Sequence, residues 1–226
     1  YLLIINYLIS YFYLFNKKYF LNNLKIPNYK INNVIYINPN KINLINSVPI
    51  KFNKSTNFII YSDWKNKQKK VSDHILDHHS YVTCNEIFLK NMHYTATKEY
   101  YFFKEKINRR INFKGCKNLQ DVDLYFINLK KLFESISKNG YKNSNSLNKI
   151  GISKEIEFMV DSKDNLVKIN SGNHRFAISK ILKLDLIPIS VNLIHIDSIN
   201  RYQFNKKISF YDNINEYLLN LEKKYK

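Results

Sequence analysis

The residues best suited to do chemistry in this chain are Ser171-Gly172-Asn173-His174-Arg175, which lie directly before a predicted helix. The first turn of a helix leaves its N–H groups without intrahelical partners and carries the positive end of the helix dipole, so it attracts anions. Gly172 permits close backbone approach, Asn173 is the predicted N-cap, and His174 and Arg175 add hydrogen-bond donors. The sequence therefore predicts an anion site, although Ser-Gly-Asn before a helix is also an ordinary capping sequence.

The elements that must position this turn are the clearest in the chain. They are a strand, a turn, a returning strand, a helix and a last strand, predicted over residues 155–160, 161–165, 166–169, 175–183 and 187–194. Pro188 stands near the start of the last strand, where a missing N–H is tolerated. This order places Gly172 between a β-hairpin and the N-terminus of a helix.

The rest of the chain gives fewer elements. The spacing of Leu129, Leu132 and Ile136 predicts a helix of about five turns that begins at Leu119 and stops at Gly140. Short strands are expected between residues 30 and 60, with apolar runs at 33–37 and 58–61, and residues 63–110 give no assignable element. A last amphipathic helix, residues 213–223, should pack on the body through Ile214, Tyr217, Leu218 and Leu221.

Together these features resemble the ParB/sulfiredoxin superfamily. The shared pattern is a strand, a Gly-x-x-Arg turn, a helix with an early small residue, and an Ile-Pro strand, here Gly172 to Ala177 and then Ile187 to Val191. Residues 132–136 followed by Asn139-Gly140-Tyr141 are similar to the helix end that precedes this core. A closer likeness, to an uncharacterised Gly-x-His-Arg branch, adds Asp63-Trp64, Lys114-Gly115-Cys116 and His195 and extends over residues 35–200.

The resemblance implies that the turn binds nucleotide phosphates. Ser171, Gly172, Asn173, His174 and Arg175 would hold a nucleoside triphosphate or diphosphate with bridging Mg²⁺. The sulfiredoxin branch needs a Cys where this chain has Asn173, so sulfinic-acid reduction is not expected. A kinase branch with a Gly-His-His-Arg turn preceded by Asp is nearest, which implies an ATP- or ADP-dependent phosphotransferase acting on a small-molecule acceptor, although Ser171 replaces that Asp.

Phosphoryl transfer would also need a base for the acceptor and carboxylates for Mg²⁺. The candidate catalytic residues are His174, Glu157, Asp161 and His195, with Glu134 and Glu155 as further acids by chain order. A histidine at a strand end is more often packed or capped than catalytic, so His195 carries both interpretations. The sequence alone assigns no catalytic base.

A second group of polar residues has the side chains of a transition-metal site. Asp73, His74, Asp77, His78 and His79 stand close together, with Cys84 and His93 beyond, but their spacing fits no known motif and a solvated polar surface is expected. No metal site is therefore predicted. The two cysteines, Cys84 and Cys116, form no C-x-x-C pair and are expected to be reduced thiols.

The formal net charge of +18 is compatible with a nucleic-acid partner. Only four of the 36 basic residues are Arg, however, and the abundance of Lys, Asn, Ile, Tyr and Phe is typical of A/T-rich coding, so such a partner is not favoured. Arg109-Arg110 could reach a phosphate but is expected to be a solvated pair. A non-enzymatic, ParB-like nucleic-acid-associated protein remains the alternative function.

The N-terminal residues 1–15 are strongly apolar but too short to span a bilayer alone, and the chain begins with Tyr rather than Met. A cytoplasmic protein, with membrane contact through this segment as an alternative, is expected. The sequence thus predicts an α+β fold with a ParB/sulfiredoxin-like core of hairpin, helix and strand plus helical extensions. Its parts are an apolar helical arm (1–29), the core domain (30–200) and a C-terminal helix packed on it (201–226).

Overall fold

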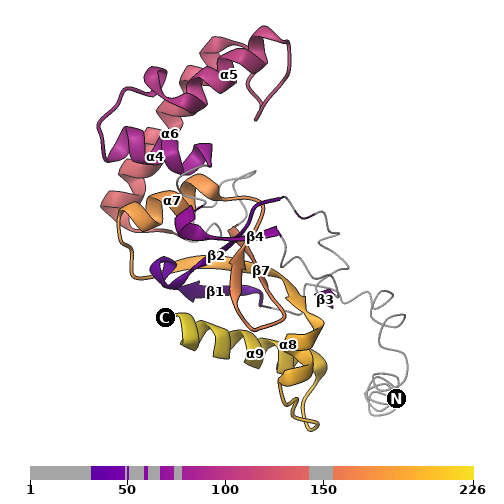
Figure 1. Cartoon of the computed structure of the whole chain (residues 1–226). Coiled ribbons are helices and arrows are strands. Elements are labelled where there is room, and N and C mark those ends of the chain that lie inside the picture. The colour runs from indigo at the N-terminus through magenta and orange to yellow at the C-terminus, as the bar shows by residue number, and fades with distance from the viewer. Residues whose placement is uncertain (1–31, 49, 51–58, 61–66, 74–77, 143–154) are drawn as a thin grey trace.

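The structure of the chain is a computed structural model that describes residues 32–48, 50, 59–60, 67–73, 78–142 and 155–226. The predicted N-terminal arm, Asp63-Trp64, His74 and Asp77 lie outside these residues. The described part belongs to the predicted α+β class, with one mixed sheet and helices on both of its faces (Figure 1).

The described strands form a single seven-stranded sheet. They are β1 (Val34–Ile37), β2 (Leu44–Asn46), β3 (Ile59–Ile60), β4 (Gln68–Lys70), β5 (Ile156–Val160), β6 (Leu166–Lys168) and β7 (Ile187–His195). Their order is β1-β7-β5-β6-β2-β4, and β3 pairs with β7 as well. β5 runs parallel to β7 and antiparallel to β6, and β6 runs parallel to β2. The hairpin of β5 and β6 therefore lies in the middle of the sheet.

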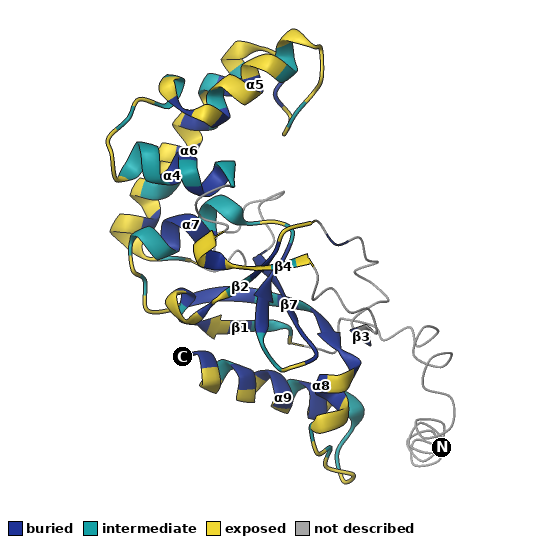
Figure 2. Ribbon diagram, in the orientation of Figure 1, coloured by how far each residue is buried: buried dark blue, intermediate teal, exposed yellow. Residues whose placement is uncertain are grey.

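Helices lie on both faces of the sheet. They are α4 (His79–Phe88), α5 (Lys98–Asn108), α6 (Leu119–Asn139), α7 (Asn173–Ile181), α8 (Ile196–Arg201) and α9 (Phe210–Tyr225), with short 3-10 turns η2 (Pro39–Lys41) and η4 (Tyr94–Ala96). α7 covers one face and α4, α5 and α6 are stacked beyond it, whereas α9 runs along the opposite face beside β1 (Figure 1). The outermost helix, α5, is mostly exposed (Figure 2).

The central strands are buried because helices cover both faces of the sheet. All five residues of β5 are buried, and β7 is apolar or buried at seven of its nine positions, the pattern expected of a strand with no solvated face. α6 begins at Asn118, whose side chain accepts from the Asp121 N–H at 2.9 Å, and it ends at Gly140, whose φ is 69°. These signals fix the helix that forms one wall of the candidate site.

Most of the predicted elements are confirmed. The predicted hairpin, the helix from Leu119 to Gly140, the strand from Ile187 and the apolar run 33–37 all form as expected, as β5 and β6, α6, β7 and β1. The last helix is longer than predicted, and Ile214, Tyr217, Leu218 and Leu221 are buried against the body. Residues 63–110, which gave no assignable element, contain α4 and α5. Among the described residues, no helix is long and apolar enough to cross a membrane.

Candidate functional site

Gly172 turns the chain from β6 into α7. It is the N-cap of α7 and has φ 91° and ψ 18°, a left-handed conformation that favours glycine. A Cβ placed on Gly172 would lie 3.1 Å from both Cα and Cγ1 of Ile156, so a side chain would also press on β5. The prediction that Asn173 is the N-cap is wrong: Asn173 is the first residue of the helix, because the left-handed turn falls one residue earlier.

The first turn of α7 has no side-chain cap. The first intrahelical bond runs from the N–H of Phe176 to the carbonyl of Gly172 at 2.9 Å, so the N–H groups of Asn173, His174 and Arg175 precede the helical ladder. The N–H groups at a helix N-terminus carry partial positive charge and suit an anion.

A pocket of about 420 Å³ lies at this turn. Gly172, Asn173, His174 and Arg175 line one side of it, and α6 lines the other with Tyr125, Asn128, Leu129 and Leu132. Four of the five predicted binding residues therefore line one cavity. Ser171 is exposed beside it and is not among the lining residues, and its carbonyl accepts from the Glu157 N–H at 3.5 Å. A cavity of this size with one polar and one mostly apolar wall has the character of a small-molecule site.

The side chains of the turn are held by distant elements. The Asn173 side chain accepts from the Lys168 ammonium and lies 3.4 Å from Nε2 of His78, the residue that caps α4. Arg175 donates from Nη1 to the Tyr141 hydroxyl at 3.1 Å. Burial raises the pKa of Tyr141 to about 12; the nearby charge of Arg175 opposes this rise, and Glu155 adds to it. Glu155, an acidic candidate by chain order, is buried and is not among the residues that line the pocket.

A buried carboxylate, Glu99 on α5, stands behind His174. Its side chain is fully buried, and its oxygens lie 3.1 Å from Nε2 of His174, 2.9 Å from Nζ of Lys114 and 3.7 Å from Nε2 of His79. Burial alone would raise the pKa of Glu99, but the hydrogen bond and charge of His174, together with Lys114, lower it to about 2. Because an ionised carboxylate only accepts, Nε2 of His174 donates to it, and Nδ1 faces the Tyr125 hydroxyl at 3.5 Å.

A buried ammonium, Lys168 at the end of β6, stands behind Asn173. Lys168 is 1% exposed and donates to the carbonyls of Ile169 and Asn170 at 2.9 and 3.1 Å. Burial lowers the pKa of Lys168 to about 7, with Glu157 opposing this shift and Arg175 adding to it. Glu157, a predicted catalytic candidate, is thus the buried carboxylate beside Lys168.

Two other predicted candidates lie at the far end of the central strands. Asp161 follows β5, and its carboxylate accepts from the N–H groups of Lys163 and Asn165 at 2.8 and 2.9 Å, which closes the hairpin. His195 ends β7 and caps α8 by accepting from the Asp197 N–H at 3.1 Å. Neither residue lines the pocket at Gly172, because that turn lies beside Ile156, at the opposite end of β5.

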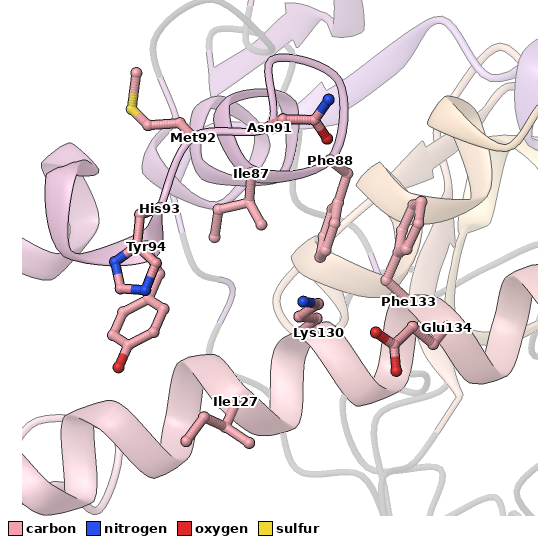
Figure 3. A pocket seen from close by; sticks show the side chains of 10 residues that line it. All are labelled: Ile87, Phe88, Asn91, Met92, His93, Tyr94, Ile127, Lys130, Phe133 and Glu134. Carbon is pink, nitrogen blue, oxygen red and sulfur yellow. The ribbon is translucent and has the colours of Figure 1, made fainter.

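A second pocket, of about 510 Å³, lies on another side of α6 (Figure 3). Ile127, Lys130, Phe133 and Glu134 of α6 line it together with the end of α4 and the segment up to Tyr94. The acidic candidate Glu134 therefore lines this pocket (Figure 3) and is not among the residues that line the pocket at the glycine turn.

The histidine-rich segment was predicted to be a solvated surface, and this is wrong for two of its histidines. His78 and His79 are half-buried, their rings stack at 4.4 Å, and they contact Asn173 and Glu99 behind the turn. Asp73 and His93 are exposed as expected. Within the described residues, no group of three or more His, Cys, Asp or Glu side chains is arranged to hold a metal ion. Cys84 and Cys116 are free thiols, and both are buried.

Sequence reasoning missed Glu99, Lys168 and Tyr125. Lys168 interrupts the apolar strand Leu166-Val167-Lys168-Ile169, and a charged residue in such a strand is a signal that could have been used. Glu99 had only a weak signal, since Thr97 two residues before it is a helix N-cap. Arg109 and Arg110 are both exposed, as expected, and Arg109 also pairs with Glu105.

No protein-family model, curated protein or solved structure matches this chain.

Proposed function

We propose that this chain is a ParB/sulfiredoxin-like protein that binds the phosphates of a nucleotide at the Gly172 turn. The observation that carries the proposal is the first turn of α7, which has no side-chain cap and opens into the pocket lined by residues 172–175. Three backbone N–H groups at a helix N-terminus are suited to phosphate oxygens. The order of hairpin, glycine turn, helix and strand supports the family assignment.

The charges around the pocket suit an anionic ligand. Arg175 lines the pocket with a guanidinium that can fork onto two phosphate oxygens, and Lys168 adds a buried positive charge behind the turn. The nearest carboxylate on the α5 side, Glu99, is already bound to His174 and Lys114. The residues that line the pocket include Arg175 and no carboxylate, so a phosphate at the turn would contact a positive side chain.

The opposite wall suits the rest of a nucleotide. Leu129, Leu132 and the Tyr125 ring give apolar surface, and Asn128 adds an amide that can donate and accept. Mg²⁺ would accompany the nucleotide and neutralise part of the phosphate charge. We assign it no protein ligand, because no group of three or more His, Cys, Asp or Glu side chains among the described residues is arranged to hold a metal ion.

Transfer of the phosphoryl group to a small acceptor would need a base in the same pocket. His174 is the side chain there that can accept a proton, because Glu99 fixes Nε2 as the donor and leaves the lone pair of a neutral ring on Nδ1. A buried carboxylate that orients a histidine in this way is a common arrangement for proton transfer.

Isothermal titration with ATP, ADP, CTP and GTP, each with Mg²⁺, tests the proposal. We expect one or more nucleotides to bind, and Arg175→Ala to weaken that binding by roughly tenfold or more, since it removes a charge-assisted contact. Arg201→Ala is the matched control, because Arg201 is paired with Asp164 and is not among the residues that line the pocket. The proposal fails if no nucleotide binds, or if folded Arg175→Ala binds as tightly as the wild type.

A further inference from the structure

Lys168 is an unusual residue, because its ammonium lies in the protein interior with all three N–H groups used. They go to the carbonyls of Ile169 and Asn170 and to the side chain of Asn173. Burying a lone ammonium is costly unless each donor finds an acceptor. Here all three acceptors belong to the short segment that leads from β6 into α7, so the hydrogen bonds of the ammonium hold this segment in place.

The segment that Lys168 holds has a constrained backbone. Asn170 and Gly172 both have positive φ, 39° and 91°. The Asn170 side chain is fixed by two hydrogen bonds to the backbone of Ile50, one accepted from its N–H at 2.7 Å and one donated to its carbonyl at 3.0 Å. A strained backbone conformation persists only where surrounding contacts hold it in place. Lys168 supplies three of the hydrogen bonds that hold this segment.

We infer that Lys168 is a positioning residue of the phosphate site, and that an anion bound at the Gly172 turn is stabilised by the positive charge of Lys168 and keeps that lysine protonated. The inference rests on the proposed function, because it concerns the same site. The ammonium bonds to the side chain of Asn173, the first residue of α7, and to two carbonyls of the segment before it, so it lies beside the turn whose N–H groups would contact phosphate.

The surroundings of Lys168 make its protonation sensitive to a new charge. Burial lowers its pKa to about 7, Glu157 on β5 opposes that shift, and Arg175 on α7 adds to it. His78, the residue before α4, is a further titratable group, and its ring contacts the Asn173 side chain to which Lys168 bonds. The strand β2, which pairs with β6, contains no charged residue. A dianionic phosphate would raise the pKa of Lys168, so binding near neutral pH takes up a proton and affinity decreases as the pH rises.

Isothermal titration of MgATP in two buffers of different ionisation enthalpy, from pH 6.5 to 8.5, measures this proton. We expect the wild type to lose roughly three- to tenfold in affinity across this range and to take up part of a proton near neutral pH. Lys168→Met should bind more weakly and show less uptake, whereas Lys180→Met, on the last turn of α7, should behave as the wild type. Because the nucleotide titrates identically in every variant, the difference isolates Lys168.

If Lys168→Met does not fold, an NMR titration of the wild-type protein tests the same inference. Wild-type protein labelled at lysine ¹³Cε should show one lysine that titrates near neutral pH and whose pKa rises when MgATP is added. The inference is overturned if MgATP binds and no lysine shifts, or if folded Lys168→Met takes up the same proton as the wild type. Absence of MgATP binding to the wild type, with none for other nucleotides, instead overturns the proposed function.

Discussion

Replacing Gly172 by alanine should destabilise the protein in two separable ways. The residue has φ 91°, and a left-handed conformation costs a non-glycine residue about 1–2 kcal/mol. The new Cβ would also lie 3.1 Å from two atoms of Ile156, one of them backbone, and overpacking of this kind costs about 1–3 kcal/mol. The sum is roughly 2–5 kcal/mol, which corresponds to a decrease in Tm of roughly 4–20 °C for a chain of this length.

Gly115→Ala is the matched control for this prediction. Gly115 has φ 84°, close to that of Gly172, but its Cβ would meet no atom within 4 Å. It should therefore lose only the backbone contribution of about 1–2 kcal/mol. Urea unfolding of both variants measures the difference, which is the free energy of the contact with Ile156. Equal losses of stability in the two variants would refute the reasoning that β5 presses on the turn.

Two further predictions concern a buried carboxylate behind the pocket and a carboxylate in the hairpin turn. Glu99→Gln should lower the free energy of unfolding by about 3 kcal/mol at pH 7, since it leaves His174 without its buried carboxylate partner. Because folding lowers the pKa of Glu99 from 4.5 to about 2, its stabilisation is complete above pH 4.5 and disappears as the pH falls toward 2. Urea unfolding at several pH values should show the two proteins converging in acid, and a constant difference would contradict this. Asp161→Ala should cost about 1–3 kcal/mol by thermal unfolding, through its lost turn hydrogen bonds, and leave nucleotide affinity unchanged; weaker binding would place Asp161 in the site after all.

The hairpin, the glycine turn and α7 could be predicted from the sequence because their signals are local. A turn-rich segment between two apolar runs and a glycine before an amphipathic stretch each depend on only a few neighbouring residues. The same hairpin could also have been used to predict that Asp161 lies far from the glycine turn. In an antiparallel hairpin the loop lies at the opposite end from the segment that leaves the second strand, so Asp161 is separated from Gly172 by the length of β5.

The helical part of the site could not be predicted because its pattern is obscured. α5 carries Tyr101 and Phe102 on an exposed surface and Phe103 in the core, so the apolar period that identifies a helix is lost. Without α5, nothing in the sequence brings Glu99 to His174, which is 75 residues away. The N-cap was misplaced for a related reason: Asn173 has cap chemistry, but its side chain is engaged by Lys168.

The place of α7 between two groups of elements has a mechanical consequence. One side of α7 packs on the sheet, and its other side contacts α4 and α6, which carry α5 (Figure 1). A ligand bound between the first turn of α7 and the pocket-lining residues of α6 would contact both groups of elements and so stabilise the packing of the outer helices on the sheet. Occupancy would then slow amide hydrogen exchange in α5 and α6 as well as at the turn, because local opening of those helices would first require the ligand to leave.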